Sequence, residues 1–458
     1  MIRVAPSRLL LLPFLLSCAC VAARAADAPV SFRRDVAPIL VKQCQGCHNA
    51  EKNKGQYRVD SFERLMRPGK SKDAPIRAGH PKDSPLYRLI TTADDDERMP
   101  QKADPLPAAQ VATIGRWIEE GAKFDGGSDP ATPLTSLAPA QEHPAPPAAY
   151  HLPLPITALA LSPDGTVLAA GGYNEVTLWD PADGKLVGRI PRVAERTYAI
   201  AFSPDGKTLA VAGGVPGTLG ELRLCDVASR EPGRILDRIA DVMLTARFSP
   251  DGAHVAAGGA DNLVRVYTAA TGARDLLIEQ HADWITDLAY SPDGAQLASA
   301  SRDRSARVFD AKTGAMRAAF LAHEEPVVGV AWLAGGTQLV TAGRDRRLRT
   351  WDAADAKEVG KPVALGAEPT RLEAAGGKIY CSLVNGNVRA FSAADRSPAG
   401  TSEATGDYAY CVAVDEKHRR LIAGYHSGTV RVFALDGAGK AVNTFVASPG
   451  YVTKGTGH

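Results

Sequence analysis

The chain after residue 150 repeats itself, and this repetition limits the folds open to it more than any other feature. A Ser-Pro-Asp-Gly motif, preceded by a run of alternating apolar residues, begins at Ser162, Ser203, Ser249 and Ser291. Strand-like segments end in an aromatic residue or a substitute at Trp179, Cys225, Tyr267, Phe309, Trp351, Phe391 and Phe433. These ends lie 40 to 46 residues apart, a period typical of four-stranded propeller blades. We therefore predict an all-β, seven-bladed propeller over residues 150–447 and a tail at 448–458.

The endings Trp179-Asp180 and Trp351-Asp352 resemble those of the WD-repeat family. The resemblance covers roughly residues 152–445, and in the last two units it depends on spacing because the turn motif and the Trp-Asp ending are missing. Residues at the positions of that family's turn histidine and tight-turn aspartate are His281, His323, Asp261, Asp303 and Asp345. The resemblance implies that they form structural hydrogen-bond networks rather than a catalytic site.

Near the N-terminus, Cys44-Gln45-Gly46-Cys47-His48 forms a C-x-x-C-H pattern. Two thiols at this spacing can add to the two vinyl groups of a porphyrin, and the next histidine then reaches the iron. A zinc site needs about four ligands, and residues 26–124 contain no second cysteine pair. A redox dithiol of the thioredoxin type would require a β-α-β unit, which this region does not indicate. The pattern predicts one covalent haem c on Cys44 and Cys47, with His48 as the proximal iron ligand.

The second axial ligand has several candidates in the same region. Met99 follows an acidic run and precedes Pro100 in a polar loop, the position from which cytochromes c send a thioether to the iron. We therefore expect Met99 to be the distal ligand. His80 is the alternative, and Met66 or an open position are further alternatives.

Three short helices are expected around this motif. Ser31 can cap the first, in which Pro38 introduces a kink near the start. Ser84, directly before a proline, can cap the second. The third carries Trp117 and stops at Gly121, which suits a left-handed C-terminal cap. The pattern predicts a small all-α domain over residues 26–124.

With these motifs, the stretch from 30 to 124 resembles the planctomycete-type cytochrome c domain. The segments that carry the resemblance are Lys54-Gly55 to Asp60, Gly79 to Leu86 (Gly-x-Pro-x-x-Ser-Pro-Leu), Arg98 to Pro100 (Arg-Met-Pro) and Trp117 to Ala122 (Trp-Ile-x-x-Gly-Ala). The resemblance implies one covalent haem with His48 and Met99 as axial ligands. Two departures stand out: His80 replaces a polar residue, which keeps a bis-histidine site open, and Pro107 replaces the Ser or Thr cap of the last helix.

The first 25 residues indicate export. Arg3 and Arg8 precede an apolar stretch over 9–23, and Ala23-Arg24-Ala25 has the form that a signal peptidase reads, so we expect cleavage before Ala26. The apolar stretch is too short for a bilayer span, which leaves no transmembrane helix after cleavage. An alternative is a lipoprotein signal at Leu15-Leu16-Ser17-Cys18, with a lipid anchor on Cys18. Either reading places the protein in the periplasm or cell envelope.

Residues 125–149 are rich in proline, and we expect an extended linker that separates the two domains without docking them. We expect Cys225, Cys381 and Cys411 to be buried free cysteines, because their spacing forms no disulfide framework. The formal charge of +2 gives no indication of nucleic-acid binding.

These features predict an exported monohaem cytochrome that transfers electrons, with a propeller that docks redox partner proteins. With both axial positions filled by protein, iron exchanges electrons and turns over no substrate, so we expect no enzyme activity. Alternatives are a haem enzyme or a haem-based sensor of gas or redox state. The propellers of the comparable nitrite reductases and quinone dehydrogenases have eight blades, whereas seven units are counted in this chain.

Overall fold

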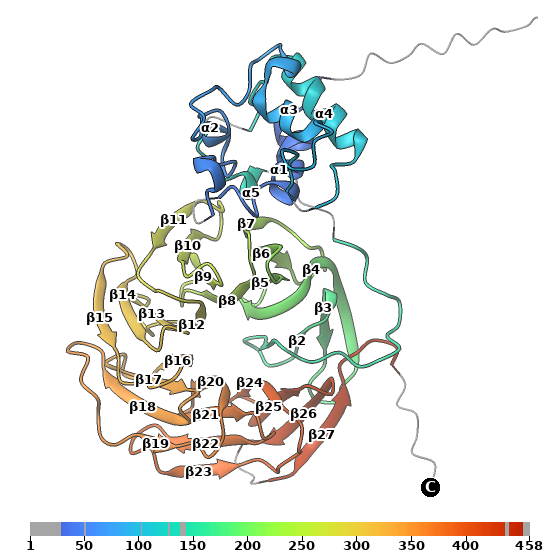
Figure 1. Ribbon diagram of the computed structural model, residues 1–458. Helices are drawn as coiled ribbons and strands as arrows, with labels where there is room; N and C mark the ends of the chain where they lie inside the picture. The colour runs from blue at the N-terminus through green and yellow to red at the C-terminus, as the bar shows by residue number, and fades with distance from the viewer. Residues whose placement is uncertain are drawn as a thin grey trace, which may run out of the picture.

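The computed structural model describes residues 29–49, 52–101, 103–126, 129–137, 143–435 and 439–451. The predicted signal peptide and Cys18 lie outside these ranges. Within them, no helix has both the length and the apolar character that crossing a membrane requires. A small helical region precedes a large all-β region, whose sheets are arranged around a common centre (Figure 1).

The helical region is built from short elements packed around one apolar core. They are η1 (Phe32–Val36), α1 (Ala37–Gln43), η2 (Lys54–Gln56), α2 (Phe62–Leu65), η3 (Pro81–Asp83), α3 (Pro85–Thr91), α4 (Ala108–Glu119) and α5 (Leu134–Leu137). Phe32, Leu40, Ile114 and Trp117 are buried in the core. Phe32 meets the Trp117 ring at 5.3 Å between centroids, so the first and last predicted helices share one aromatic contact.

The ends of these helices follow the predictions in part. The Ser31 hydroxyl accepts from the Arg34 amide at 2.9 Å, but the helix opens as a π-turn, and Pro38 falls in the first turn of α1, where its missing N–H is tolerated. Ser84 precedes α3 without capping it, because its hydroxyl accepts from Arg77 N at 2.8 Å and donates to His80 O at 2.9 Å. Gly121 has φ +100° and gives α4 the predicted left-handed cap.

The all-β region consists of antiparallel sheets in which strands that are consecutive in sequence are neighbours. The first sheet contains β1 (Leu159–Leu161), β2 (Leu168–Gly171), β3 (Tyr173–Trp179), β4 (Leu186–Phe202), β5 (Thr208–Val215), β6 (Leu219–Asp226) and β7 (Ile235–Ile239). The next two contain β8 (Met243–Phe248), β9 (His254–Gly259), β10 (Val264–Thr268) and β11 (Arg274–Ile278), then β12 (Ile285–Tyr290), β13 (Gln296–Ser301), β14 (Ala306–Asp310) and β15 (Met316–Phe320). The following two contain β16 (Val327–Trp332), β17 (Gln338–Gly343), β18 (Arg347–Asp352) and β19 (Val363–Ala364), then β20 (Pro369–Ala375), β21 (Lys378–Leu383), β22 (Val388–Ser392) and β23 (Pro398–Thr401). The last contains β24 (Ala409–Asp415), β25 (Arg420–Tyr425), β26 (Thr429–Ala434) and β27 (Ala441–Val446).

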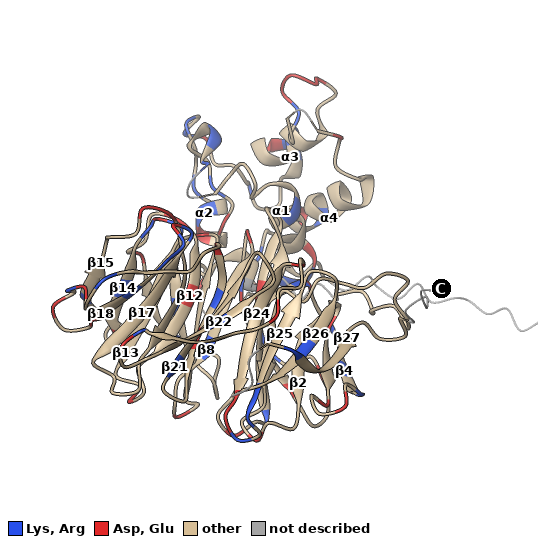
Figure 2. Cartoon of the chain, turned by 90° about the horizontal axis from the view of Figure 1, so that it is seen from below, with Lys and Arg blue, Asp and Glu red and all other residues tan. Residues whose placement is uncertain are grey.

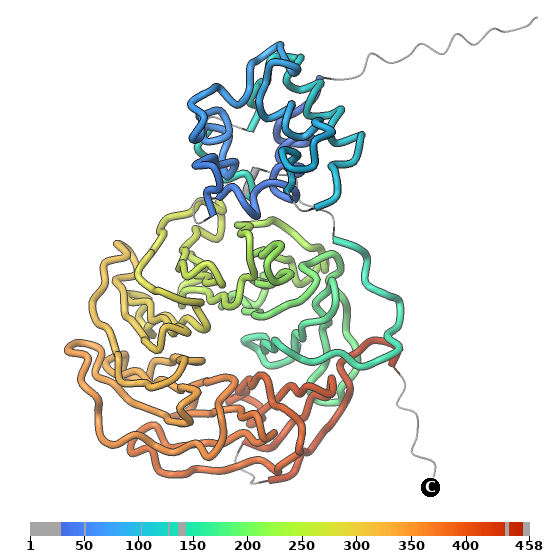
Figure 3. Tube along the Cα trace, in the orientation of Figure 1, coloured from blue at the N-terminus to red at the C-terminus, as the bar shows by residue number. Residues whose placement is uncertain are grey.

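Within the described residues, the region forms one seven-stranded sheet and five four-stranded sheets. The seven-stranded sheet holds two repeat units, because the 17-residue strand β4 pairs with β3 through its first part and with β5 through its second. Strand β13 is buried on both faces, since the sheets pack face to face; Val308 and Phe320 of one sheet share a core with Val327 and Trp332 of the next. The trace in Figure 3 follows this succession of sheets around the centre.

Each Ser-Pro-Asp-Gly motif forms the turn between the first two strands of a unit. In the first copy, the Ser162 hydroxyl donates to Asp164 at 2.6 Å and accepts from Val167 N at 2.9 Å. The hydrogen bond from the Ser162 hydroxyl, together with two from Thr166, lowers the pKa of Asp164 to about 2. Gly165 has φ +76°, a conformation that favours glycine, so the motif is explained by turn geometry alone.

Two of the predicted histidine networks are present. His281 contacts Asp303 at 2.8 Å and Ser299 at 2.6 Å. His323 contacts Asp345 at 2.9 Å and Thr341 at 2.7 Å in the next sheet. Asp261, the third aspartate of the series, differs because it pairs with Arg265 of its own sheet instead of a histidine.

Replacing Asp303 with alanine is expected to destabilise the β region by ~1–3 kcal/mol, because the buried His281 would lose its acceptor. The measurement is the urea midpoint of the intact protein. A matched control is Asp283→Ala, which removes a partly exposed pair with Arg302 and an acceptor of the Trp284 amide, and is expected to cost about 1 kcal/mol or less. Equal losses in the two variants would contradict a structural role for the network.

We expected the proline-rich segment to separate the two regions without docking them. In the structure, it contacts both regions. Leu134 is buried in the helical core, and its amide donates to Asp60 O at 2.9 Å. The other end of the segment lies on the β region, where Arg189 donates to the carbonyls of Pro147 and Ala148 at 2.6 and 3.0 Å. Proline lacks an N–H but keeps its carbonyl acceptor, so such a segment can dock through arginine.

Candidate functional site

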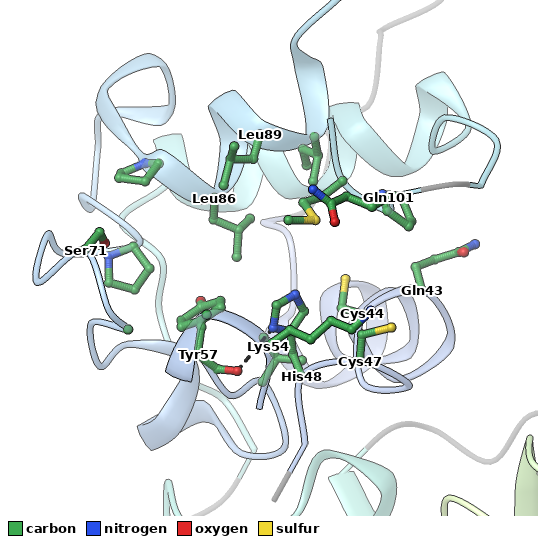
Figure 4. Close-up of a pocket in the computed structure, with 18 of the residues that line it drawn as sticks. Gln43, Cys44, Cys47, His48, Lys54, Tyr57, Ser71, Leu86, Leu89 and Gln101 are labelled. Carbon is green, nitrogen blue, oxygen red and sulfur yellow. Dashed lines mark hydrogen bonds between the residues drawn. The ribbon is translucent and has the colours of Figure 1, made fainter. Parts of the chain in front are cut away.

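A cavity of about 490 Å³ opens in the helical region (Figure 4). Apolar side chains form much of its wall, from the strand-like segment after η2, from α3 and from the loop before α4. They are Val59, Leu86, Leu89, Ile90 and Leu106. A deep apolar cavity in so small a domain indicates a site for a large apolar group.

The C-x-x-C-H residues lie together on the wall that follows α1. The helix ends at Gln43, and the amides of Cys47 and His48 both donate to Cys44 O, at 3.2 and 3.1 Å. This turn brings Cys44, Cys47 and His48 to the same side of the cavity (Figure 4). Both thiols are free.

The two thiols differ in their surroundings, since Cys44 is partly buried and Cys47 is exposed. Burial, with a smaller contribution from Cys47, raises the pKa of the Cys44 thiol to about 12. Across the described part of the chain, no cluster of three or more His, Cys, Asp or Glu residues could hold a metal ion.

The His48 ring is oriented by its neighbour Tyr57. Its Nδ1 lies 3.2 Å from Tyr57 O, and a proton on Nδ1 that is donated to this carbonyl leaves Nε2 as the free lone pair. Tyr57 is fixed in turn, because its hydroxyl donates to Leu65 O at 2.8 Å and its ring packs edge-on to the imidazole. Tyr57 was not predictable from the sequence, since no pattern marks a backbone carbonyl as a partner.

The structure separates the three candidates for the second axial ligand. Met99 lines the cavity, and its amide donates to Leu89 O at 2.9 Å, which ties its loop to α3. His80 is exposed and does not line the cavity. Met66 packs against the helical core and does not line the cavity. Only Met99 among these three shares the cavity with Cys44, Cys47 and His48.

Lysines stand at the polar part of the cavity wall. Lys54 and Lys70 both line it and are exposed. Their loops approach closely, because the Lys70 amide donates to Gly55 O at 2.8 Å and a Cβ at Gly69 would meet that oxygen at 2.7 Å. Two glycines therefore allow two lysines to share one side of the cavity.

The residues present fit a covalently bound haem. Two free thiols and an imidazole with a free nitrogen lie on one wall, a thioether lines the same cavity, and the remaining wall is largely apolar. This donor set fits neither a four-ligand zinc site nor a dithiol without a cofactor. The two lysines suit the carboxylates of such a group.

Comparisons with known proteins agree with both halves of the chain. The family model "Planctomycete cytochrome C" matches residues 44–102. The model "WD domain, G-beta repeat" matches residues 150–180, 240–268, 274–310 and 315–352. "Small ribosomal subunit protein RACK1z" of Oryza sativa subsp. japonica is 29% identical over 120 residues, which are 24% of this chain. The match spans about a third (34%) of the length of that protein.

Proposed function

We propose that this chain, in which a segment of planctomycete cytochrome c type precedes WD40 repeats, is an exported monohaem c-type cytochrome that transfers electrons. The β region would serve as the scaffold that docks its redox partner. The observation that carries the proposal is the cavity that Cys44, Cys47, His48 and Met99 share.

Each residue has a distinct role in this proposal. Cys44 and Cys47 would hold the haem through thioethers, and His48 would be its proximal ligand, kept in place by Tyr57 O. Met99, positioned by Leu89 O, would be the distal ligand. When bound, the haem supplies a one-electron redox centre, and a thioether ligand raises its potential. The protein's part is to close both axial positions and exclude other ligands.

The β region is proposed to be a closed seven-bladed propeller. The seven-stranded sheet accounts for two blades and the four-stranded sheets for five. Contacts between the first and last sheets support closure: Ile156 N donates to Tyr425 O at 3.0 Å, and the Cys411 thiol lies 3.2 Å from Ile156 O. A closed ring presents a rigid face, and WD40 repeats generally mediate protein–protein interaction, so docking is a fold-level inference.

The visible spectrum of the haem-loaded protein tests the site. We expect a low-spin spectrum with a sulfur-to-iron charge-transfer band, and no binding of carbon monoxide to the reduced protein. Met99→Ala is expected to abolish this band and to admit carbon monoxide. Met66→Ala and His80→Ala are matched controls, since neither side chain lines the cavity, and both are expected to leave the spectrum unchanged.

Two results would contradict the assignment. Ready binding of carbon monoxide by the unmutated protein would favour ligand sensing or catalysis over electron transfer. A band that persists in Met99→Ala, or ligation lost in His80→Ala, would move the distal ligand away from Met99.

A further inference from the structure

A second cavity, of about 450 Å³, lies at the centre of the β region. The innermost strand of several sheets contributes to it, and the loops that precede these strands form its mouth. Contributing strands are β1, β4, β8, β12, β16, β20 and β24. The lining residues of these strands include the small side chains of Ala158 and Ala199 beside larger ones such as Tyr198 and Tyr410.

Three arginines and one glutamate line this cavity. Arg302 and Arg344 occupy equivalent positions in neighbouring sheets, just after β13 and β17, where their amides donate to Trp284 O and Pro326 O at 2.9 and 2.8 Å. Arg371 comes from β20, and Glu368 is the acidic residue of the lining. Arg302 is paired with Asp283 at 3.3 Å, whereas Arg344 is exposed and no ion pair joins it to an acidic residue in the described part of the chain. Its charge is therefore available to an anionic partner.

Behind the lining lies a cluster of two arginines and two acidic residues. Arg247 and Arg371 both approach the buried carboxylate of Asp287, at 3.2 and 3.3 Å. Glu373 is the fourth member, 3.5 Å from Arg247. Burial raises the pKa of Glu373, and the nearby Arg247 and Arg371 act in the opposite direction. Arg371 belongs both to the cavity lining and to this cluster, so its guanidinium group is held in place by Asp287.

Two exposed aromatic rings lie beside the cavity. Trp284 is 37% exposed, whereas each of the other four tryptophans is at most 7% exposed. Arg302 stacks on Trp284 at 4.2 Å from the ring centroid. Tyr408, 52% exposed, stacks on the cavity-lining Tyr410 at 6.3 Å. Aromatic and arginine side chains together are typical of the centre of a protein interface.

The mouth lies on the face of the β region to which the helical region is attached. Strands β3 and β6 start on this face, and the segment that joins the two regions contacts both starts: Tyr150 hydrogen bonds to Glu175 at 2.6 Å, and His143 to Glu221 at 3.2 Å. Figure 2 shows α1, α2 and α4 beyond one side of the array of sheets. A partner held at the mouth would therefore be on the same side as the haem domain.

We infer that this central cavity docks an acidic segment of the redox partner protein, with Asp or Glu carboxylates entering between Arg302, Arg344 and Arg371. Charge complementarity selects this occupant, and Trp284 and Tyr408 provide the apolar contacts around the mouth. The inference rests on the proposed function and adds the chemistry of the partner and the surface that recognises it.

Binding of a fluorescein-labelled hexaglutamate peptide to the haem-loaded full chain, followed by anisotropy at low ionic strength, tests the inference. We expect saturable binding that hexalysine does not show, and an increase in Kd of about tenfold in Arg344→Ala and Arg302→Ala. Arg346→Ala and Arg304→Ala are matched controls, because these arginines are exposed in the same two turns but do not line the cavity. They are expected to leave Kd unchanged.

No saturable binding, or equal weakening in all four variants, would overturn the inference. Trp284→Ala removes an apolar contact without changing the charge of the cavity. An unchanged Kd in this variant would show that the peptide binds elsewhere. The visible spectrum, recorded on the same samples, separates this result from the proposed function. If the proposed haem site is wrong, the spectrum differs from the expected one while peptide binding is as expected. If the docking inference is wrong, peptide binding fails while the spectrum is as expected.

Discussion

Replacing Cys44 and Cys47 together with serine is expected to abolish covalent haem attachment. Both thiols face the cavity beside His48, and each is expected to form one of the two bonds that hold the porphyrin. Denaturing electrophoresis followed by haem staining measures this directly, because only covalent haem stays with the unfolded chain. We expect complete loss of staining in the double variant and retention of one attachment in each single variant.

Cys225→Ala and Cys381→Ala are the matched controls for this experiment. Both residues are buried free cysteines of the β region, as the sequence analysis expected, and neither lines the haem cavity. Their variants are expected to keep full staining, and the mass of the intact chain should include one haem. Staining that survives in the double cysteine variant would show that this cavity does not hold the haem covalently.

The elements of this site were predictable to different degrees, for physical reasons. The C-x-x-C-H pattern is local, so a single turn after α1 is enough to bring Cys44, Cys47 and His48 together. The choice between Met99 and His80 depends on how a loop is attached to α3, and the hydrogen bond from Met99 to Leu89 is invisible in a linear pattern. The Tyr57 carbonyl that orients His48 belongs to the backbone, which any residue could supply.

The β region shows the same distinction between local and distant interactions. The repeat period predicted units of four strands, because each unit is a meander with short turns. It did not predict the buried cluster around Asp287, whose partners come from β8 and β20, far away in sequence. In a strand that alternates, a charged residue ordinarily indicates a solvent-exposed face. The docked linker was missed for a related reason, since one buried residue, Leu134, fixes it to the helical core.

Glu221→Gln is expected to destabilise the β region by ~3 kcal/mol at neutral pH, because the glutamate joins a buried ion cluster to the linker. The side chain of Glu221 is 1% exposed and lies 2.7 Å from Arg223, 3.1 Å from Arg238 and 3.2 Å from His143. Removing its charge leaves two buried guanidinium groups without this counterion. The measurement is the urea unfolding of the intact protein, and an exposed glutamate of the same unit, Glu231, provides the control Glu231→Gln.

The pH dependence of the stability difference between the unmutated protein and Glu221→Gln is a sharper test. Burial alone would raise the pKa of Glu221, but hydrogen bonds from His143 and Arg223 outweigh it and lower the pKa from 4.5 to about 2. A carboxyl whose pKa is lower in the folded protein stabilises it above the unfolded pKa, and this stabilisation is lost as pH falls through the folded pKa. The difference between 4.5 and about 2 corresponds to ~3 kcal/mol. We therefore expect the stability gap between the unmutated protein and Glu221→Gln to narrow as the pH falls from about 4.5 to about 2. A gap that stays constant down to pH 2 would show that packing of the side chain, rather than its charge, holds the linker to the β region.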